Sequence, residues 1–251
     1  MTRHALIIGG ASGIGAATAK AFADEGTTVA VVDLALDKAE AVAVALPGAG
    51  HRGYVCDVLE SSSIDSAFDA AESELGPAAV LVVAAGTPGL VDGKRPNLRD
   101  TTEADWDRVM ALNARGTFLA TRAMLRRRAA QPVEHGRIVL VASMAAQMLA
   151  VNGPPSYVAS KGAVLSFTRV AAGEAAGLGL TVNAVAPGAI DTPMLRGVMP
   201  PERDAEYLSR SVASRLGRPE DIAAAIAFLA SPAADYVNGA CIDVNGGLFM
   251  R

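Results

Sequence analysis

Short apolar runs rich in Val, Ile, Leu and Ala alternate with longer amphipathic segments along the whole chain. The apolar runs cover residues 4–8, 27–33, 53–56, 78–84, 137–142, 180–186 and 240–244. Runs of this length and composition are typical of strands that are buried on both faces of a sheet. Because helical patterns separate most of them, their order predicts an α/β fold with one doubly wound, seven-stranded parallel sheet.

The helical patterns end at residues that stop helices. A first helix is predicted up to about Glu25, before Gly26, and others cover about 61–75, 103–127, 155–176 and 219–229. Thr101 and Thr102 precede the helix at Glu103 as capping residues. The segment 191–214 is predicted to form a helical flap. No change in composition marks a linker, so we expect a single Rossmann-type domain over residues 1–251 with helices on both faces.

Composition and charge exclude several classes of partner. The 251 residues are 51% hydrophobic but only 4% aromatic, and the formal net charge is −4. We therefore expect no nucleic-acid partner. No apolar stretch reaches the ~20 residues of a membrane span, and the first apolar run is too short for a signal peptide. We expect a cytoplasmic protein that binds no membrane.

A few residues have simple expected roles. Arg126, Arg127 and Arg128 close a helical pattern, where we expect a solvated helix end. Cys56 and Cys241 are expected to be buried free thiols. The three histidines lack ligand spacing, so no metal site is predicted.

A glycine-rich turn follows the first predicted strand. Gly9, Gly13 and Gly15 suit a turn where a phosphate can approach the backbone and the start of a helix; the alternative is simply a tight turn. Asp33 ends the second strand, where a carboxylate can accept from both hydroxyls of a ribose and repels a 2′-phosphate. Neither Leu34 beside it nor Ser12 before Gly13 is a cation, which favours NAD over NADP.

Tyr157 and Lys161 lie four residues apart in a predicted helix, so their side chains share one face. A phenol has an ordinary pKa of ~10, and a neighbouring ammonium lowers that pKa. The pair is a candidate proton-transfer device. The alternative is a surface lysine beside a half-buried tyrosine.

Taken in order, these features make essentially the whole chain resemble the short-chain dehydrogenase/reductase family. The resemblance is carried by Gly9, Gly13, Ile14, Gly15, Asp33, Asp57, Ala85, Gly86, Asn113, Ser143, Tyr157, Lys161, Pro187, Gly188 and Thr192. It implies an oxidoreductase that interconverts a secondary alcohol and a ketone with NAD.

The resemblance also implies four catalytic roles. Tyr157 would be the general acid in reduction and the general base in oxidation. Lys161 would bond the nicotinamide ribose and, with the cationic ring of NAD⁺, lower the pKa of the phenol. Ser143 would donate to the substrate oxygen, and Asn113 would hold a water that links Lys161 to solvent. Alternatively, Ser143 simply ends a strand and Asn113 is a polar residue satisfied by a backbone carbonyl.

The cofactor site implied by the resemblance extends over several loops. Asp57 would meet the adenine amine and Val58 would add a backbone contact, although Asp57 could be an ordinary turn residue. Residues 187–192 would hold the nicotinamide carboxamide. The cofactor contacts expected in full are Gly9, Ser12, Gly13, Ile14, Gly15, Asp33, Leu34, Asp57, Val58, Ala85, Gly86, Tyr157, Lys161, Pro187, Gly188, Ile190 and Thr192.

The chain departs from the family pattern in two places. Ile8 stands where the family usually has Thr, and Val83-Ala84 stands where it usually has Asn-Asn. Replacing both polar sides of a contact by apolar groups can be nearly neutral. We therefore expect Ile8 and Val83 to be buried.

Apolar side chains in the loops beside the candidate catalytic residues favour a largely apolar ketone or secondary alcohol. They are Met144, Met148, Leu149, Met194, Leu195 and Met199. A methionine stripe can equally be core. Arg196 and Arg203 could meet an anionic substrate end or be solvated charges of the flap.

The sequence leaves more than one possibility open for the oligomeric state and for the function. Small and apolar residues such as Ala159, Ala163, Phe167 and Val170, with the helix around 106–121, suggest a subunit interface and a homotetramer, with a dimer as the alternative. The leading function is an NAD-dependent alcohol dehydrogenase or ketone reductase. A 3-oxoacyl-thioester reductase is the second, which Asp33 disfavours because NADPH normally serves biosynthetic reductases. The third is a catalytically idle NAD-binding scaffold.

Overall fold

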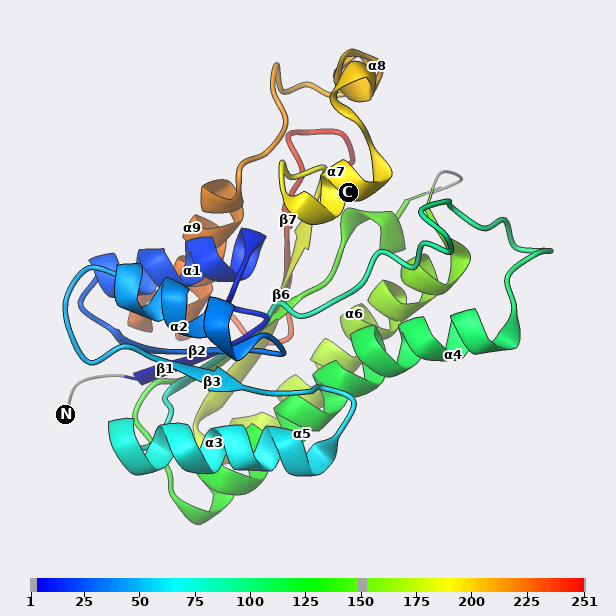
Figure 1. The fold of residues 1–251 in the computed structure, drawn as a ribbon. Helices are drawn as coiled ribbons and strands as arrows, with labels where there is room; N and C mark the ends of the chain where they lie inside the picture. The colour runs from blue at the N-terminus through cyan, green and yellow to red at the C-terminus, as the bar shows by residue number, and fades with distance from the viewer. Residues whose placement is uncertain (1–3, 149–152, 251) are drawn as a thin grey trace.

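A parallel sheet of seven strands forms the centre of the protein (Figure 1). The structure is a computed structural model that describes residues 4–148 and 153–250. The strands are β1 (His4–Ile8), β2 (Thr28–Asp33), β3 (Arg52–Val55), β4 (Val80–Val83), β5 (Gly136–Val141), β6 (Leu180–Pro187) and β7 (Cys241–Val244). Their order is β3-β2-β1-β4-β5-β6-β7, and all neighbours run parallel. The predicted fold class is confirmed.

Helices cover both faces of this sheet (Figure 1). One face carries α1 (Gly13–Asp24), α2 (Leu36–Ala45) and α9 (Pro219–Ala230), and the other carries α3 (Ser61–Leu75), α5 (Gly116–Ala130) and α6 (Pro155–Ala175). A π-helical turn, Ala111–Arg115, joins α4 (Glu103–Met110) to α5. Two short helices, α7 (Pro193–Val198) and α8 (Asp204–Leu208), form the predicted flap above the carboxyl end of the sheet.

Local sequence explains most of these boundaries. Thr102 caps α4, because its side chain accepts a hydrogen bond from the Asp105 backbone N–H at 3.1 Å. The helix predicted to end at Arg127 continues to Ala130. Sequence analysis identified no helix at α2. Only Ala39 and Ala43 of α2 are buried, so its apolar stripe is too thin to stand out in the sequence.

Side chains alternate strictly between the two cores. In β1, Ala5 and Ile7 pack with α1, α2 and α9, whereas Leu6 and Ile8 pack on the opposite face. Ile8 and Val83 are 1% and 3% exposed, which confirms that the two apolar replacements are buried. The strands they belong to are joined through the backbone, since the Ala84 N–H donates to the Ile8 carbonyl at 2.8 Å.

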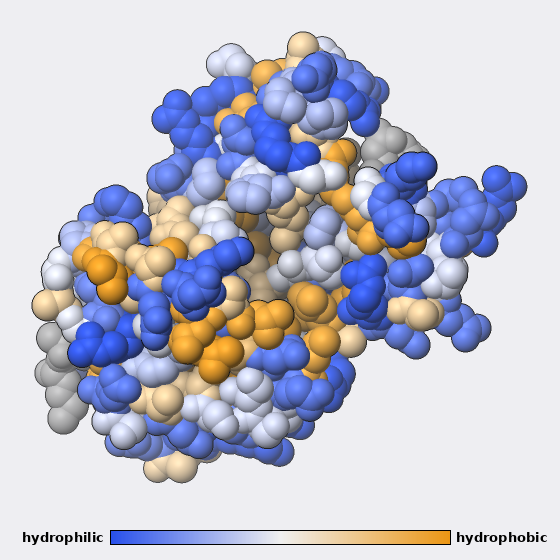
Figure 2. Space-filling view, in the orientation of Figure 1, coloured by the Kyte–Doolittle hydropathy of each residue, from blue (hydrophilic) through white to orange (hydrophobic). Residues whose placement is uncertain are grey.

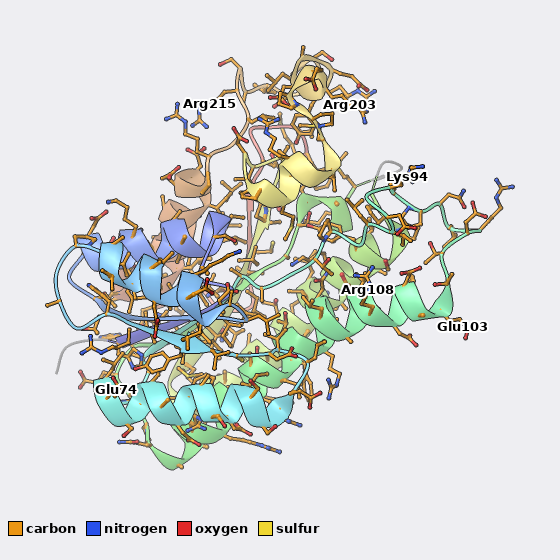
Figure 3. All side chains as sticks on the ribbon, viewed as in Figure 1. Glu74, Lys94, Glu103, Arg108, Arg203 and Arg215 are labelled. Atoms are coloured by element: carbon orange, nitrogen blue, oxygen red, sulfur yellow. The ribbon has the colours of Figure 1, made fainter. Side chains whose placement is uncertain are left out.

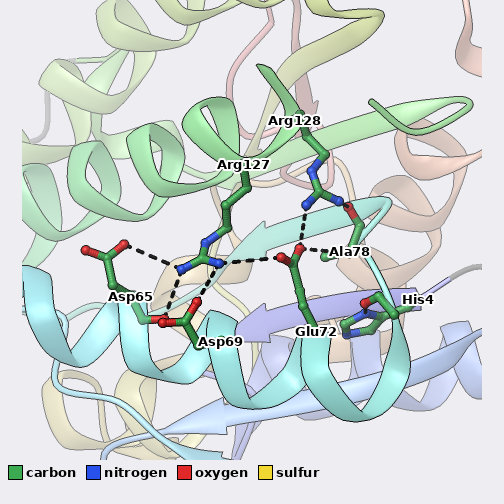
Figure 4. A network of polar contacts seen from close by, with 8 residues as sticks. His4, Asp65, Asp69, Glu72, Ala78, Arg127 and Arg128 are labelled. Atoms are coloured by element: carbon green, nitrogen blue, oxygen red, sulfur yellow. Dashed lines mark hydrogen bonds and ion pairs between the residues drawn. The ribbon is translucent and has the colours of Figure 1, made fainter. Parts of the chain in front are cut away.

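The arginines that end α5 are not a solvated terminus, contrary to the sequence prediction. Arg128 is 1% exposed and donates to the Ala78 carbonyl at 2.8 Å and to Glu72 at 2.7 Å (Figure 4). Arg127 pairs with Asp69 at 2.8 Å and lies over the Phe68 ring. The cause is tertiary: α3 runs alongside and presents acidic side chains to this end of α5. Only Arg126 is exposed.

The remaining structural expectations have mixed outcomes. Cys56 is buried, but Cys241 is only half-buried because β7 is the edge strand of the sheet. In the described residues no helix has both the length and the apolar character to cross a membrane. No group of three or more His, Cys, Asp or Glu that could hold a metal ion occurs in residues 4–148 and 153–250. Phe118 and Val170 are exposed, and the subunit interface stays a prediction.

We predict that Arg128→Ala lowers the free energy of unfolding by about 3 kcal/mol, because it leaves Glu72 and the Ala78 carbonyl without their buried partner. Urea denaturation measures the effect. Arg126→Ala is the matched control, since it removes the same side chain from an exposed position and is expected to change stability by less than about 0.5 kcal/mol. Equal losses for the two variants would show that the buried contacts contribute nothing specific.

Candidate active site

A cavity of about 420 Å³ opens at the carboxyl edge of the sheet. It lies beside the ends of β1 and β4, where the strand order reverses and where ligands bind in folds of this class. Figure 2 shows the hollow between the lobe that carries α7 and α8 and the body of the protein. Both loops and helices contribute to its walls, and the candidate residues that line it are Ile14, Gly86, Ser143, Tyr157, Lys161, Pro187, Gly188, Ile190 and Thr192.

The glycine-rich turn after β1 is packed too tightly for side chains at two positions. A Cβ on Gly9 would lie 2.4 Å from the Ala85 nitrogen, and one on Gly15 would lie 2.0 Å from the Gly9 carbonyl oxygen. Gly9 also has a φ of +80°. The turn therefore brings the start of α1 directly against the ends of β1 and β4.

The start of α1 has the properties of an anion site. Ser12 is the N-cap but its side chain makes no capping hydrogen bond, and no acidic residue lies in the first turn. The first amide groups of a helix have no intrahelical partner and carry the positive end of the dipole. A phosphate fits this turn, and Ile14 places the same turn on the cavity wall.

Asp33 lies at the end of β2, next to this turn. One of its carboxylate oxygens accepts a hydrogen bond from the Ala11 backbone N–H at 3.1 Å, and the residue is half-buried. Remaining lone pairs on both oxygens can accept from hydroxyl groups. The neighbouring Leu34 is 68% exposed and adds no charge. Together with the helix start, this arrangement fits a dinucleotide with an unmodified adenosine ribose.

Asp57 and Val58 have local structural roles. The Asp57 carboxylate accepts from the Leu59 N–H at 2.9 Å, and its own N–H donates to the Ser63 hydroxyl at 2.9 Å. Asp57 therefore acts as an ordinary turn residue, the alternative expected from the sequence. Val58 is buried against Gly116. Neither residue lines the cavity, and their contact with an adenine stays a prediction.

Ser143, Tyr157 and Lys161 converge on the cavity from two elements. Ser143 follows β5 and is 8% exposed, whereas Tyr157 and Lys161 lie one turn apart on α6. The Lys161 ammonium donates to the Val141 carbonyl at 2.7 Å and lies 6.0 Å from the centroid of the Tyr157 ring. A proton donor, a hydroxyl and a cation thus face one space.

Burial controls the protonation of this pair in the protein alone. Burial raises the pKa of Tyr157 above its ordinary value. Hydrogen bonding with Ser143 lowers this pKa but offsets only part of the increase. Burial also lowers the pKa of Lys161 to about 8. In the protein alone the direction is therefore opposite to the one expected from the lysine, because burial is the main cause of the shift. The lowering of this pKa by Lys161 together with the cationic ring of NAD⁺ stays a prediction.

Asn113 is fully buried in the π-helical turn and does not line the cavity. Its amide oxygen accepts from the Thr87 N–H at 2.8 Å, and its amide nitrogen donates to the Thr87 carbonyl and the Ser160 hydroxyl at 3.0 Å each. The side chain therefore ties the loop after β4 to α6. Satisfaction by backbone groups was the simpler alternative for this residue, and the water-holding role stays a prediction.

The segment after β6 forms another wall. The Gly188 N–H donates to the Val244 carbonyl at 3.0 Å, which fixes the segment to the end of β7. Thr192 caps α7 by accepting from the Leu195 N–H at 3.2 Å, and its methyl group would contact a Cβ on Gly13. Pro187, Gly188, Ile190 and Thr192 all line the cavity, beside the glycine-rich turn.

The loops and the flap supply an apolar lining. The predicted residues that line the cavity are Met144, Met148, Met194, Leu195 and Met199, and Leu149 lies outside the described residues. Arg203 lines it as well, whereas Arg196 instead pairs with Asp191 and Asp204 at 2.7 Å each. Sequence analysis did not identify Tyr207 and Arg210, which also line the cavity. Their helical spacing from Arg203 was the available signal.

The chain is similar to known oxidoreductases over almost its whole length. A family model described as "Enoyl-(Acyl carrier protein) reductase" matches residues 9–249. The chain is 38% identical over 249 residues to D-threitol dehydrogenase of Mycolicibacterium smegmatis, covering 98% of this chain and 93% of the relative. It is 41% identical over 247 residues to cis-4-hydroxycyclohexanecarboxylate dehydrogenase of Sinomonas cyclohexanicum, covering 98% of this chain and 96% of the relative.

A solved structure shows the same architecture. The crystal structure of a short-chain type dehydrogenase/reductase from Mycobacterium marinum superposes with a TM-score of 0.91 at 29% identity, covering 99% of this chain and 96% of the other.

We predict a pH dependence of stability from Lys161. Its pKa is about 8 when folded against an ordinary value of 10.5, so between these values the unfolded chain binds more protons. The free energy of unfolding of the wild type should therefore rise relative to Lys161→Met by about 2 kcal/mol between about pH 8 and pH 10. Urea denaturation at each pH measures this difference. A difference that stays constant or shrinks over this range would contradict the burial of a charged lysine.

Proposed function

The chain belongs to the short-chain dehydrogenase/reductase family, and we propose that it is an NAD(H)-dependent oxidoreductase that interconverts a secondary alcohol and a ketone. The observation that carries this proposal is the convergence of Ser143, Tyr157 and Lys161 on one cavity beside the glycine-rich turn. Three groups of this kind supply a proton donor, an oxygen-binding hydroxyl and a cation at one reacting oxygen.

The family generally uses nicotinamide cofactors, and the residues of this chain fit one. The first turn of α1 would hold the pyrophosphate, Asp33 would accept from the adenosine ribose, and residues 187–192 would hold the nicotinamide end. When bound, the nicotinamide would supply or accept the hydride. NAD rather than NADP is proposed because Asp33 repels a 2′-phosphate and Leu34 offers no cation.

In ketone reduction Tyr157 acts as the general acid. Its phenol stays protonated at neutral pH because burial raises its pKa. The O–H donates its proton to the carbonyl oxygen as negative charge develops there. The Ser143 hydroxyl, 8% exposed at the end of β5, donates a second hydrogen bond to the same oxygen.

In alcohol oxidation the same phenol must act as a base. Tyr157 then takes the hydroxyl proton of the alcohol, which requires a phenolate that burial disfavours. The Lys161 ammonium, held by the Val141 carbonyl, is the protein cation closest in sequence and space to support that phenolate. Because its own pKa is about 8, this support weakens as the pH rises past that value.

The cavity favours a largely apolar substrate. Methionine and leucine side chains surround the space above Ser143 and Tyr157, and the volume of about 420 Å³ admits a small molecule. The two relatives are named for the oxidation of small alcohols, threitol and a hydroxylated cyclohexane acid. A small secondary alcohol or the matching ketone is therefore the proposed substrate class.

A reductase of 3-oxoacyl thioesters is the second candidate. A relative of that name favours it: the chain is 34% identical over 247 residues to 3-oxoacyl-[acyl-carrier-protein] reductase of Escherichia coli. Asp33 opposes it, because such biosynthetic reductases normally use NADPH. An idle cofactor-binding scaffold is less consistent with this site, since a protein without turnover has no need of Ser143 and Tyr157 together in a cavity.

We predict that Tyr157→Phe lowers kcat by about 10²- to 10⁴-fold, because it removes the group that transfers the proton. Binding of NADH, followed by fluorescence, should persist. Tyr236→Phe is the matched control, because Tyr236 is fully exposed and outside the cavity, and it should retain full activity. Turnover that survives in Tyr157→Phe would remove the assigned acid and base.

We predict that kcat/KM is higher with NAD⁺ than with NADP⁺ by about 100-fold, because a carboxylate beside a phosphate is repulsive. The double variant Asp33→Asn with Leu34→Arg should reverse the preference, since it replaces the repulsion with a cation. Asp24→Asn, an exposed carboxylate at the other end of α1, is the control and should change nothing. Equal use of both cofactors by the wild type would contradict the role of Asp33.

A further inference from the structure

The flap presents a charged face to the cavity in addition to its methionines. Arg203, Glu206, Tyr207 and Arg210 follow one another at spacings of three, one and three residues, which places them on one side of α8 and its flanks. All four line the cavity. Figure 3 shows Arg203 on this raised part of the chain, and Figure 2 shows that the lobe is largely hydrophilic outside.

Tyr207 fixes this face over the cavity. Its hydroxyl oxygen accepts a hydrogen bond from the Ala189 backbone N–H at 3.0 Å, in the segment that follows β6. Tyr207 is half-buried, and burial raises its pKa, so the hydroxyl stays protonated. Arg203 and Arg210 lie one turn before and one turn after this anchor. Both are exposed, which places them at the solvent end, away from the buried Ser143 and Lys161.

The charges on this face do not cancel. Arg203 donates from Nε and Nη2 to one oxygen of Glu206 at 3.2 and 3.1 Å, and these hydrogen bonds lower the pKa of that carboxyl. Within the residues that the structure describes, the Arg210 guanidinium makes no hydrogen bond or ion pair of its own. By contrast, Arg196 and Arg215 are each paired to an aspartate at 2.7 and 2.6 Å. Arg210 acts on the Glu206 carboxyl through its charge but makes no hydrogen bond to it. Two arginines thus share one carboxylate, so this face carries one excess positive charge.

The cavity wall thus combines polar groups at Ser143 and Tyr157, several methionines, and two exposed arginines. A guanidinium whose N–H groups have no acceptor is suited to a carboxylate or a similar oxyanion, which it can hold with two parallel hydrogen bonds. We infer that the substrate is a secondary alcohol or ketone with an acidic group at its far end, and that Arg210, supported by Arg203, binds that group. This inference rests on the proposed function of the same site.

The test is a kinetic comparison of hydroxy acids with their methyl esters, in a chain-length series with NAD⁺. At one chain length the acid should have at least about tenfold higher kcat/KM than its ester, mainly through a lower KM, because a charged hydrogen bond is gained. The advantage should shrink as the salt concentration rises. Binding is measured separately as the increase in Tm that each acid causes, which requires no turnover.

Substitutions of the charged residues on this face test which of them cause the preference for acids over esters. Arg210→Gln should lower the acid-to-ester ratio of kcat/KM by about tenfold and abolish the Tm increase, and Arg203→Gln should lower the ratio less. Glu206→Gln should raise the ratio, because it releases Arg203. Arg215→Gln is the matched control: it removes the same charge nearby, outside the cavity, and should leave the ratio unchanged (Figure 3).

The outcomes separate this inference from the proposed function. If neutral alcohols and esters reduce NAD⁺ as well as acids do, or if Arg210→Gln keeps the ratio, the anion site is overturned while the proposed function stands. A preference for coenzyme A thioesters over free acids would assign the arginines to the phosphates of coenzyme A. This result would also overturn the inference that they bind an acidic group of the substrate itself. If acids raise Tm only when Arg210 is present but nothing is oxidised or reduced, the anion site stands and the proposed function fails. No Tm shift and no turnover overturns both.

Discussion

The junction of β1 with β4 is the constraint on which the rest of this structure depends. At this point the strand order reverses, and the N–H groups of Ala84 and Ala85 both donate to the Ile8 carbonyl. The turn that follows β1 then crosses so close to Ala85 that position 9 has no room for a side chain. Because these backbone contacts hold the strands together, the usual polar side chains of the family can be replaced by Ile8 and Val83 without opening the sheet. The same junction places the start of α1 and the ends of the central strands at one crevice.

Within that crevice, desolvation dominates the electrostatics of the candidate proton-transfer pair. It holds the phenol of Tyr157 in its protonated form and brings the pKa of Lys161 to about 8. In the proposed mechanism this protonated phenol is the proton donor of ketone reduction. Proton acceptance demands additional positive charge, which NAD⁺ is proposed to bring to the site. A single tyrosine can in this way serve both directions, with the balance set by its surroundings and not by its position on α6.

The segment of α7 and α8 is the part of the cavity proposed to select the substrate. It contributes both apolar and charged side chains to the cavity wall. Because the hydroxyl of Tyr207 bonds to the segment after β6, the charged face is held to the same segment that is proposed to hold the nicotinamide end. The proposed substrate and cofactor contacts thus share one segment of backbone. The fold alone does not select a substrate, and the residues of 191–214 that line the cavity are the ones proposed to contact it.

The sequence by itself determined the seven strands, their succession along the chain, the places of Gly9 and Asp33 at strand ends, and the spacing of Tyr157 and Lys161 in one helix, because buried runs, turn residues and helical periodicity are local signals. The order of the strands within the sheet was not among these predictions. The sequence could not reveal α2, whose buried stripe consists of two alanines. Only the tertiary structure decided that Arg128 is buried against Glu72, that burial sets the direction of the Tyr157 pKa, and that Arg203 and Arg210 line the cavity with Glu206 as their one shared carboxylate. Each of these outcomes depends on which distant segments come into contact and on how much water they exclude. The spacing of residues along the chain determines neither the contacts nor the exclusion of water.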